Sequence, residues 1–402
     1  MSKRVKAIIF SASLLVAAFA VMGGLNVRAA GINKNEGAYR QIGVYSEVLS
    51  RIRSEYVEEP NLGLVTNGAL HGLLESLDPD SSYLNAEEYK VYKAHKSDGK
   101  GDIGATVSKP FGYAAVISVI PGGPADKAQI HNGDIIEAID GKSTREMSLA
   151  EVHNLVTGEP GSNVNFSLVR ARRAEPQKVT VTRAVVNVPA SLEKMMEANV
   201  GYIKVFAFNK GKAQEIASRI RSLEHAGAKK LILDLRNVSS GEPQEGISTA
   251  NLFLSRGAIA SLSGQKYKRE DFSADAQKAV TSLPLVVLVN RGTAGPAEIV
   301  AAAILDNTRG DVLGEKTFGE GSVQKVIEMP DGAALILSVA KYHSPSGKSI
   351  QDDAVTPNIT VAQEPDFGID EDETPQTPET NPQNAPDEQL RRAIEVLKNR
   401  PS

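Results

Sequence analysis

The sequence predicts a multidomain α+β protein with an N-terminal helical module, a β-rich domain and an α/β core built on a parallel sheet. Its 402 residues exceed the length of one typical domain, and 41% of them are hydrophobic, as is ordinary for globular proteins. The apolar pattern changes from helical spacing to short β-type runs, and then to alternating strand-like and helix-like segments. These changes place the helical module at residues 36–90, the β-rich domain at 91–186, the core at 189–362 and a tail at 363–402.

The helical module is expected to contain two amphipathic helices. Apolar residues recur at helical spacing from Tyr39 to Tyr56, with charged residues between them. A second apolar stripe runs from Ala69 to Leu77. It stops at Asp78-Pro79, because a residue that precedes proline is disfavoured in the helical conformation.

The β-rich domain has a motif at its centre. Between Pro121 and Lys142, the dipeptides Asn132-Gly133 and Asp140-Gly141 suit tight turns, because these residues tolerate positive φ. The segment resembles a PDZ domain. Strands are expected at Ala114–Ile120, Val164–Val169 and Lys178–Thr182.

The PDZ resemblance implies a peptide-binding edge. PDZ domains add an extended peptide to a sheet edge and close backbone N–H groups on its C-terminal carboxylate. The loop expected to do so here is Gly101-Asp102-Ile103-Gly104. Asp102 stands where the family usually has another glycine, and its charge would repel an incoming carboxylate.

The core pattern predicts a parallel sheet. Lys230–Leu235 and Leu285–Val289 are short apolar runs typical of strands buried on both faces. The second run leads into a predicted helix from Ala297 to Leu305, and Pro296 fits its first turn, where a missing N–H costs nothing. Since a helix N-terminus stabilises developing negative charge, this turn is a candidate place for chemistry.

The sequence around this helix resembles the core of the C-terminal processing (tail-specific) serine peptidases. The similar segments are Asn290–Ile299, Gly314–Gln324 and Lys341–Gln351. The resemblance extends from about Tyr39 to Thr360 and includes the PDZ insertion. It implies a crotonase/Clp-like α/β core.

The resemblance also implies that the catalytic pair is missing. In active members, a serine near the start of this helix attacks the peptide carbonyl, and a lysine removes its proton. Gly295 stands at the serine position and Glu320 at the lysine position. Gln324 matches the glutamine that assists the lysine. A glutamate could accept a proton, but Gly295 offers no hydroxyl to activate.

A third change falls on the loop that helps to hold the oxyanion. The family has Asn-Pro-Gly-Gly there, whereas this chain has Val238-Ser239-Ser240-Gly241. If Ser240 cannot adopt the backbone angles that glycine allowed, the donors at Ser240 and Gly241 are misplaced. We therefore expect a pseudopeptidase that binds protein C-termini without cleaving them.

Two alternatives stay open. One is an active serine-type endopeptidase with substitute residues, using Thr293 or Ser322 as nucleophile and Lys316 or Lys325 as base. The other is a structural adaptor in which even peptide capture is lost, because Asp102 repels the carboxylate.

Composition excludes several other classes. The chain has no cysteine, so disulfides, thiolate chemistry and Cys-ligated zinc are excluded. With 45 basic and 49 acidic residues, no broad basic face for nucleic acid is expected. No metal or cofactor is expected, because histidines are scattered and the stretch Gly314–Gly321 lacks the Gly-Lys-Ser/Thr ending of a phosphate loop.

The N-terminus predicts export. Lys3, Arg4 and Lys6 precede an uncharged run at residues 7–25, and residues 1–30 form either a cleaved signal peptide or a retained membrane anchor. We expect a periplasmic or cell-envelope protein, free or anchored in the inner membrane. Its expected partners are the C-terminal segments of exported proteins and a second copy, bound through the N-terminal helices.

The tail differs from the rest of the chain. Between Glu364 and Glu388 it has nine acidic residues, five prolines and no lysine or arginine, so it is expected to be disordered. A final amphipathic helix from Asp387 to Asn399 is expected to dock on the body or on a partner.

Overall fold

The structure is a computed structural model that describes residues 34–95, 100–110, 112–170, 175–362 and 387–400. The predicted signal or anchor at residues 1–30 and the predicted disordered stretch before the last helix lie outside the described residues. The chain divides into two compact units, Met1–Ala69 and Leu70–Ser402.

The first unit contains α2 (Lys34–Glu55) and the start of α3 (Leu62–Glu75). Both predicted amphipathic helices therefore form. The apolar side chains Ile42, Val44 and Val48 of α2 are exposed. Across the described residues, no helix combines the length and the apolar character that crossing a membrane requires.

The second unit holds three sheets. The sheet of the β-rich region has the strand order β2-β3-β4-β6-β7, with β5 beside β4 and with β2 at the edge. Its core includes Ile103, Ile136, Phe166 and Leu168, which are almost fully buried. Its elements are β2 (Ala105–Ser108), β3 (Ala114–Val119), α5 (Pro124–Lys127), β4 (Ile135–Ile139), β5 (Lys142–Ser143), a 3-10 turn (Thr144–Glu146), α6 (Leu149–Val156), β6 (Asn163–Val169) and β7 (Gln177–Thr182).

The predicted parallel sheet is present in the core region. Its order is β17-β14-β13-β10-β9-β8, and every neighbouring pair is parallel except β8 with β9. Its strands are β8 (Leu192–Met196), β9 (Val200–Lys204), β10 (Lys230–Asp234), β13 (Leu285–Val289), β14 (Asp311–Gly314) and β17 (Ile359–Thr360), and 3-10 turns lie at Glu197–Asn199 and Ala276–Lys278. Strands β10 and β13 are buried at every position, as their continuous apolar runs predicted.

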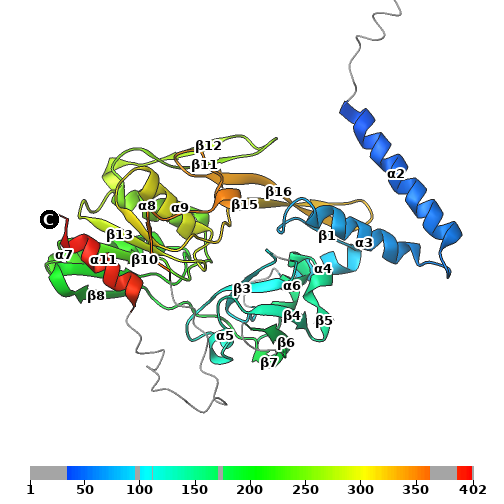
Figure 1. Ribbon diagram of the computed structural model, residues 1–402, viewed down its shortest axis with the longest axis horizontal. Coiled ribbons are helices and arrows are strands. Elements are labelled where there is room, and N and C mark those ends of the chain that lie inside the picture. The colour runs from blue at the N-terminus through cyan, green and yellow to red at the C-terminus, as the bar shows by residue number, and fades with distance from the viewer. Residues whose placement is uncertain (1–33, 96–99, 111, 171–174, 363–386, 401–402) are drawn as a thin grey trace, which may run out of the picture. The chain divides into compact units, whose positions relative to one another are not determined.

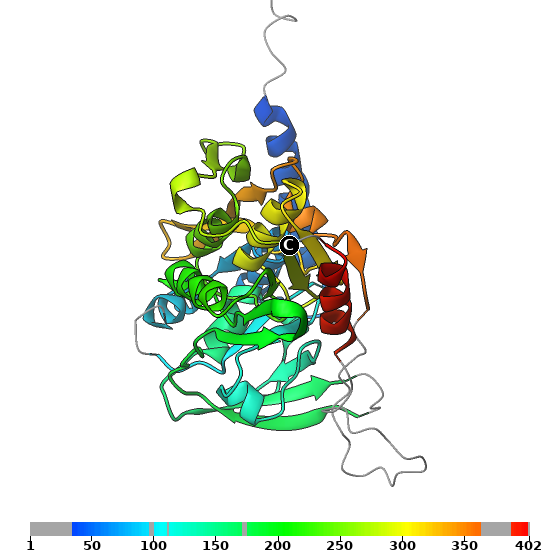
Figure 2. The same ribbon diagram turned by 90° about the vertical axis from the view of Figure 1, so that its left-hand side faces the viewer.

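Helices cover both faces of this sheet (Figure 1). α7 (Lys212–His225), α8 (Pro243–Phe253) and α9 (Pro296–Asp306) pack on one face. The terminal helix α11 (Glu388–Lys398) packs on the other, through Ala393, Ile394 and Leu397. Figure 2 shows α11 and α7 on opposite sides of the strands.

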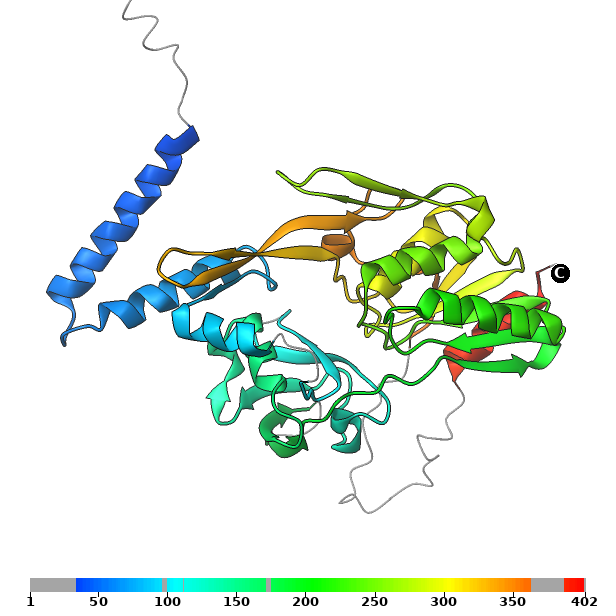
Figure 3. The ribbon, with the colours of Figure 1, turned by 180° about the vertical axis from the view of Figure 1, so that it is seen from behind.

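The third sheet is antiparallel and was not predicted from the sequence. Its order is β1-β16-β11-β12, with β15 beside β16. The strands are β1 (Ser82–Leu84), β11 (Ala258–Ser263), β12 (Glu270–Ser273), β15 (Ser322–Glu328) and β16 (Ala334–His343). The helices α4 (Ala86–His95) and α10 (Ile350–Asp353) adjoin it in sequence. Figure 3 shows β15 and β16 as a long hairpin.

The range predicted as a helical module, residues 36–90, also contains the short strand β1. In this strand, Ser82 pairs with Ile336 of β16. Residues from Leu70 onward belong to the same compact unit as the three sheets. The second half of this range therefore makes long-range contacts with the second unit, while the range as a domain stays a prediction.

Candidate active site

A sharp strand-to-helix turn joins β13 to α9. The side-chain oxygen of Asn290 accepts the N–H groups of Asn237 (2.9 Å) and Gly292 (3.1 Å). Thr293 donates its hydroxyl to the Leu235 carbonyl (2.9 Å) and accepts the Asn290 N–H (3.0 Å). These bonds fix the turn against the end of β10, so that α9 begins at the carboxyl end of the parallel strands.

Gly295 is the residue before the first turn of α9, with φ 57° and ψ −120°. Residues other than glycine adopt these angles only under strain, and such strained turns are typical of sites that present a nucleophile. A Cβ atom at Gly295 would meet only the Ser239 carbonyl oxygen, at 3.7 Å, which is ordinary van der Waals contact. The position predicted for the serine therefore has the strained backbone of such a turn and enough space for a side chain. Glycine, however, supplies no side chain there.

Glu298 ties this turn to the segment that contains Glu320. It is fully buried, and its Oε2 accepts the N–H of Gly295 (3.1 Å) and of Glu320 (2.8 Å). Its Oε1 accepts the Gly319 N–H (2.9 Å) and the Thr317 hydroxyl. Burial raises the pKa of Glu298 to about 8, although the hydroxyl and amide donors oppose this rise.

The structure thus brings Gly295 and Glu320 together. Their amide nitrogens contact the same carboxylate oxygen, so the two residues are neighbours, as predicted for the serine and lysine positions. The Glu320 side chain supplies no amine, and its Oε2 is buried with no hydrogen-bond partner among the described residues. Burial, with a contribution from the negative charge of Asp80, raises the pKa of Glu320 to about 7.

Asp80 forms a polar network beside Glu320. Its Oδ2 accepts the Ser322 hydroxyl (2.6 Å) and the Gln351 amide (3.1 Å). Burial raises the pKa of Asp80. Gln324 is exposed and donates to the Ser322 hydroxyl (2.6 Å), and none of its described contacts reaches Glu320. Among the described residues, no group of three acidic or histidine side chains is arranged to hold a metal ion.

The loop after Asn237 has one backbone position that requires glycine. The positive φ, 125°, falls on Gly241, where a Cβ would come within 2.4 Å of the Phe208 backbone. Ser240 does not have a positive φ, and its carbonyl accepts the Phe208 N–H (2.8 Å). The predicted misplacement of the donors depended on Ser240 needing angles that only glycine allows, and Ser240 does not take such angles here. The Ser239 hydroxyl bonds the Ser118 hydroxyl of β3.

The substitute nucleophiles are not paired with lysines. Thr293 is 0% exposed, and its hydroxyl is bonded to the Leu235 carbonyl. Ser322 donates to a carboxylate, and Lys316 and Lys325 are exposed. No described contact joins either hydroxyl to either amine, so the structure does not assemble a Ser-Lys or Thr-Lys pair here.

The predicted carboxylate loop precedes the edge strand β2. The N–H groups of Gly101 and Asp102 donate to the carbonyls of Gly158 (2.7 Å) and Ala184 (2.9 Å). The Gly104 N–H donates to the Asp102 side chain (2.6 Å). Ile103 points into the core and is 0% exposed. Sequence reasoning expected repulsion from Asp102 but not this bond.

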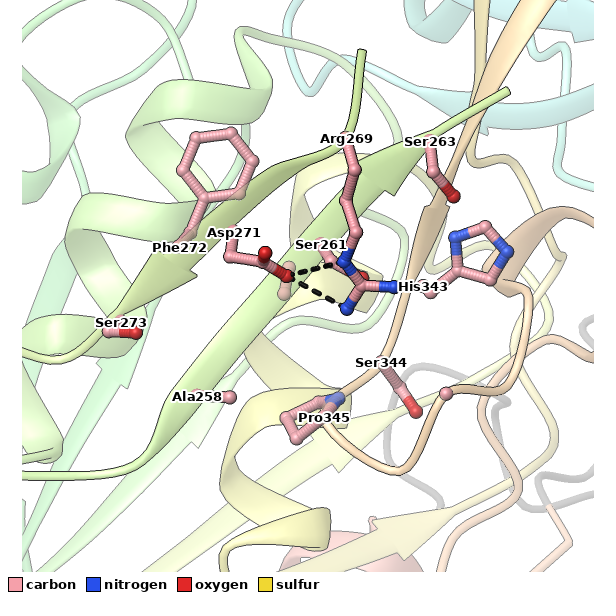
Figure 4. Close-up of a pocket in the computed structure, with 12 residues that line it drawn as sticks. Ala258, Ser261, Ser263, Arg269, Asp271, Phe272, Ser273, His343, Ser344 and Pro345 are labelled. Atoms are coloured by element: carbon pink, nitrogen blue, oxygen red, sulfur yellow. Dashed lines mark hydrogen bonds and ion pairs between the residues drawn. The ribbon is translucent and has the colours of Figure 1, made fainter. Parts of the chain in front are cut away.

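A pocket of about 300 Å³ lies elsewhere, between β11, β12 and the residues after β16 (Figure 4). Arg269 at this pocket is paired with Asp271 (2.8 Å), and Ser263 and His343 also line it. Neither Gly295 nor Glu320 lines it, so the pocket is distinct from the candidate site around Glu298.

The sequence analysis did not identify Glu298 and Asp80 as residues of the candidate site. Glu298 had a local signal, because a glutamate three residues after the residue that precedes a helix often bonds back to that residue's N–H. Asp80 had none that identified its role, since only the pairing of β1 with β16 brings it to Ser322.

Comparisons with known proteins agree with the geometry. Residues 199–361 match peptidase family S41, and residues 116–170 match the PDZ domain. The chain is 31% identical to the carboxy-terminal-processing protease of Bartonella bacilliformis, over 89% of this chain and 83% of that protein. It is 34% identical to the carboxy-terminal processing protease CtpA of Bacillus subtilis, over 82% of this chain and 71% of that protein.

A solved structure is also similar. The photosystem II D1 C-terminal processing protease matches with a TM-score of 0.66 and 27% identity, over 79% of this chain and 86% of that one. The predicted fold class is confirmed: a multidomain α+β protein with a PDZ domain and an S41-type core. The chain belongs to the C-terminal processing protease family, peptidase family S41.

Proposed function

We propose that this chain is an exported, catalytically inactive member of its family that binds protein C-termini through its PDZ domain. One observation carries the proposal. The positions predicted for the serine and the lysine share the Glu298 carboxylate through their amides, yet Gly295 offers no hydroxyl and Glu320 no amine. In serine peptidases, loss of the nucleophile or of its base lowers kcat by about 10⁶-fold.

The rest of the site supports a loss of the catalytic side chains without a loss of the surrounding fold. The turn before α9, the Glu298 bonds and the positive φ at Gly241 are intact. A lysine base needs burial that lowers its pKa, whereas the carboxyl of Glu320 has a raised pKa and accepts no hydroxyl bond in the described structure. The turn before α9 and the segment with Glu320, both bonded to Glu298, therefore form a structural element of the core.

The proposed partners are C-terminal segments of exported proteins, at the periplasmic face or elsewhere in the cell envelope. Peptides ending in small apolar residues should bind in the micromolar range or more weakly, given the charge of Asp102. We also propose self-association through α2, because Ile42, Val44 and Val48 expose an apolar surface. Residues 7–25 would give the membrane contact if they are retained.

Two alternatives make different predictions. An active enzyme with Ser322 as nucleophile would have to use Asp80, which accepts that hydroxyl, in place of a lysine. A structural adaptor would bind no free carboxylate, in keeping with the Asp102 bond to the Gly104 N–H.

Calorimetry with paired peptides tests the proposal. A peptide ending in two alanines is titrated as its free acid and as its C-terminal amide, and each mixture is then checked by intact mass. The proposal predicts weak binding of the acid, weaker binding of the amide, and no product. Equal binding of both forms would favour the adaptor. Product formation that is lost in Ser322→Ala would favour the active enzyme.

A further inference from the structure

The edge strand β2 of the PDZ domain and the glycine just before it each make a bond with one of the chain's own side chains. The Gly104 N–H donates to Asp102 Oδ1 (2.6 Å). The Val107 carbonyl of β2 accepts Nε2–H of His153 on α6 (3.1 Å). Among the described residues β2 pairs with β3 and with no other strand, so groups on its other side are those that an added peptide strand would use. One donor and one acceptor of this edge are therefore already occupied.

The Asp102 carboxylate occupies a backbone donor of the loop, the Gly104 N–H. The N–H groups of Gly101 and Asp102 belong to backbone bridges with Gly158 and Ala184, and these bridges hold the loop in place. The Gly104 N–H is different, because its acceptor is a side chain that can rotate away. Of the loop bonds described, this is the one that a peptide carboxylate can replace without breaking the fold.

The surrounding charges decide the state of Asp102 during that replacement. Burial raises the pKa of Asp102, while the Gly104 N–H, His153 and Arg183 oppose the rise. His153 lies on α6 and Arg183 follows β7, and the negative charge of Asp80 acts on His153 as well. A second carboxylate beside Asp102 would favour the neutral form of one of the two. A protonated Asp102 is a poor acceptor and would release the Gly104 N–H.

We propose that the PDZ loop binds a peptide carboxylate together with one proton, which Asp102 takes up as it releases the Gly104 N–H. Peptide affinity therefore rises as the pH falls. The inference rests on the proposed C-terminus-binding function and adds its regulation. In an acidic compartment the Gly104 N–H is free to bind a peptide carboxylate, and in a neutral one Asp102 occupies it.

Calorimetry of the purified protein with the free-acid peptide tests this, in buffers of different ionisation enthalpy and at several pH values. For the parent, we expect uptake of about one proton near neutral pH and a Kd that rises by up to tenfold per pH unit. Asp102→Asn cannot titrate, so it should bind without proton uptake and with a flat pH profile. Asp102→Gly, which also lacks the carboxylate, should match it.

Two controls isolate Asp102. Asp126→Asn changes an exposed aspartate that accepts the Gly122 N–H (2.7 Å) in the same domain, and it should behave as the parent does. His153→Gln keeps an N–H donor but removes the imidazole, and it should retain the proton uptake. If His153→Gln abolishes the uptake, the proton belongs to His153 and the proposal is wrong.

The outcomes separate this inference from the proposed function. Binding by the parent without proton uptake, with the pH profile of Asp102→Asn, would overturn the inference and leave the function standing. If no variant binds the free-acid peptide at any pH, the proposed function itself fails, and the inference fails with it.

Discussion

The Glu320→Gln substitution should stabilise the protein, and the gain should depend on pH. Glu320 has a pKa of about 7 in the fold, compared with 4.5 for a free glutamate, because burial and the charge of Asp80 disfavour its ionised form. Between these two values the folded protein binds a proton that the unfolded chain has lost. The free energy of unfolding therefore falls as the pH rises through this window, by up to about 1.4 kcal/mol per pH unit.

The size of the effect follows from the same shift. Above pH 7 the ionised side chain should lower the free energy of unfolding by at most about 3 kcal/mol. Glutamine has nearly the same shape and no charge, so Glu320→Gln should recover about 2 to 3 kcal/mol near pH 8. Near pH 4 both residues are neutral in the folded and unfolded states, and the gain should vanish.

Urea unfolding followed by circular dichroism, from about pH 4 to pH 8, measures this difference. Glu242→Gln is the matched control: Glu242 is exposed just before α8, where its charge interacts favourably with the helix dipole, so its removal should lower stability slightly near pH 8 rather than raise it. A constant offset between parent and Glu320→Gln across the range, or a loss of stability near pH 8, would show that Glu320 is not held in an unfavourable ionised state.

Three further predictions concern the frame of the site. Gly295→Ser should fold, at a cost of about 1 to 3 kcal/mol for its backbone angles, and a drop in Tm checks this. Gly241→Ser should fail to give soluble protein, because its Cβ would collide with the Phe208 backbone; equal solubility would refute the assigned φ. Arg236→Ala removes one of the two cations that contact buried Asp234, the other being Lys204, and should lower the free energy of unfolding in urea by about 3 to 5 kcal/mol; an unchanged value would refute the role given to Arg236.

The parts of the fold that depend on local pattern were predictable. Strand β13 is a continuous apolar run of valines and leucines, and Pro296 marks the first turn of α9, so both elements form where the sequence places them. Strand β1 was not predictable, because three residues carry no usable period. It exists only through its pairing with β16.

In the candidate site, too, features set by local motifs were predictable and features set by tertiary contacts were not. The motif resemblance predicted that Gly295 and Glu320 would be neighbours, and the structure places both on Glu298. The bond between Asp102 and the Gly104 N–H depends on how the loop curls between two bridges, which the sequence does not specify. The terminal helix was predicted from its amphipathic pattern, but its anchor, Arg236 bonded to Asp387 (2.7 Å), is a tertiary contact.

A double variant separates two explanations of the proposed inactivity, the missing catalytic pair and the segment predicted to be the oxyanion loop. A Gly295→Ser, Glu320→Lys double variant restores the two side chains that the family uses. Restored cleavage of a peptide with an apolar C-terminus would show that only the pair was lost. Continued inactivity in a folded variant would implicate the segment Val238–Gly241.

The most direct test of lost catalysis is the intact mass of an unfolded protein substrate after prolonged incubation with the purified parent protein. Our account predicts an unchanged mass, because the position of the nucleophile has no side chain. A truncated product that forms with the parent, and disappears in Thr293→Ala or Ser322→Ala, would contradict it.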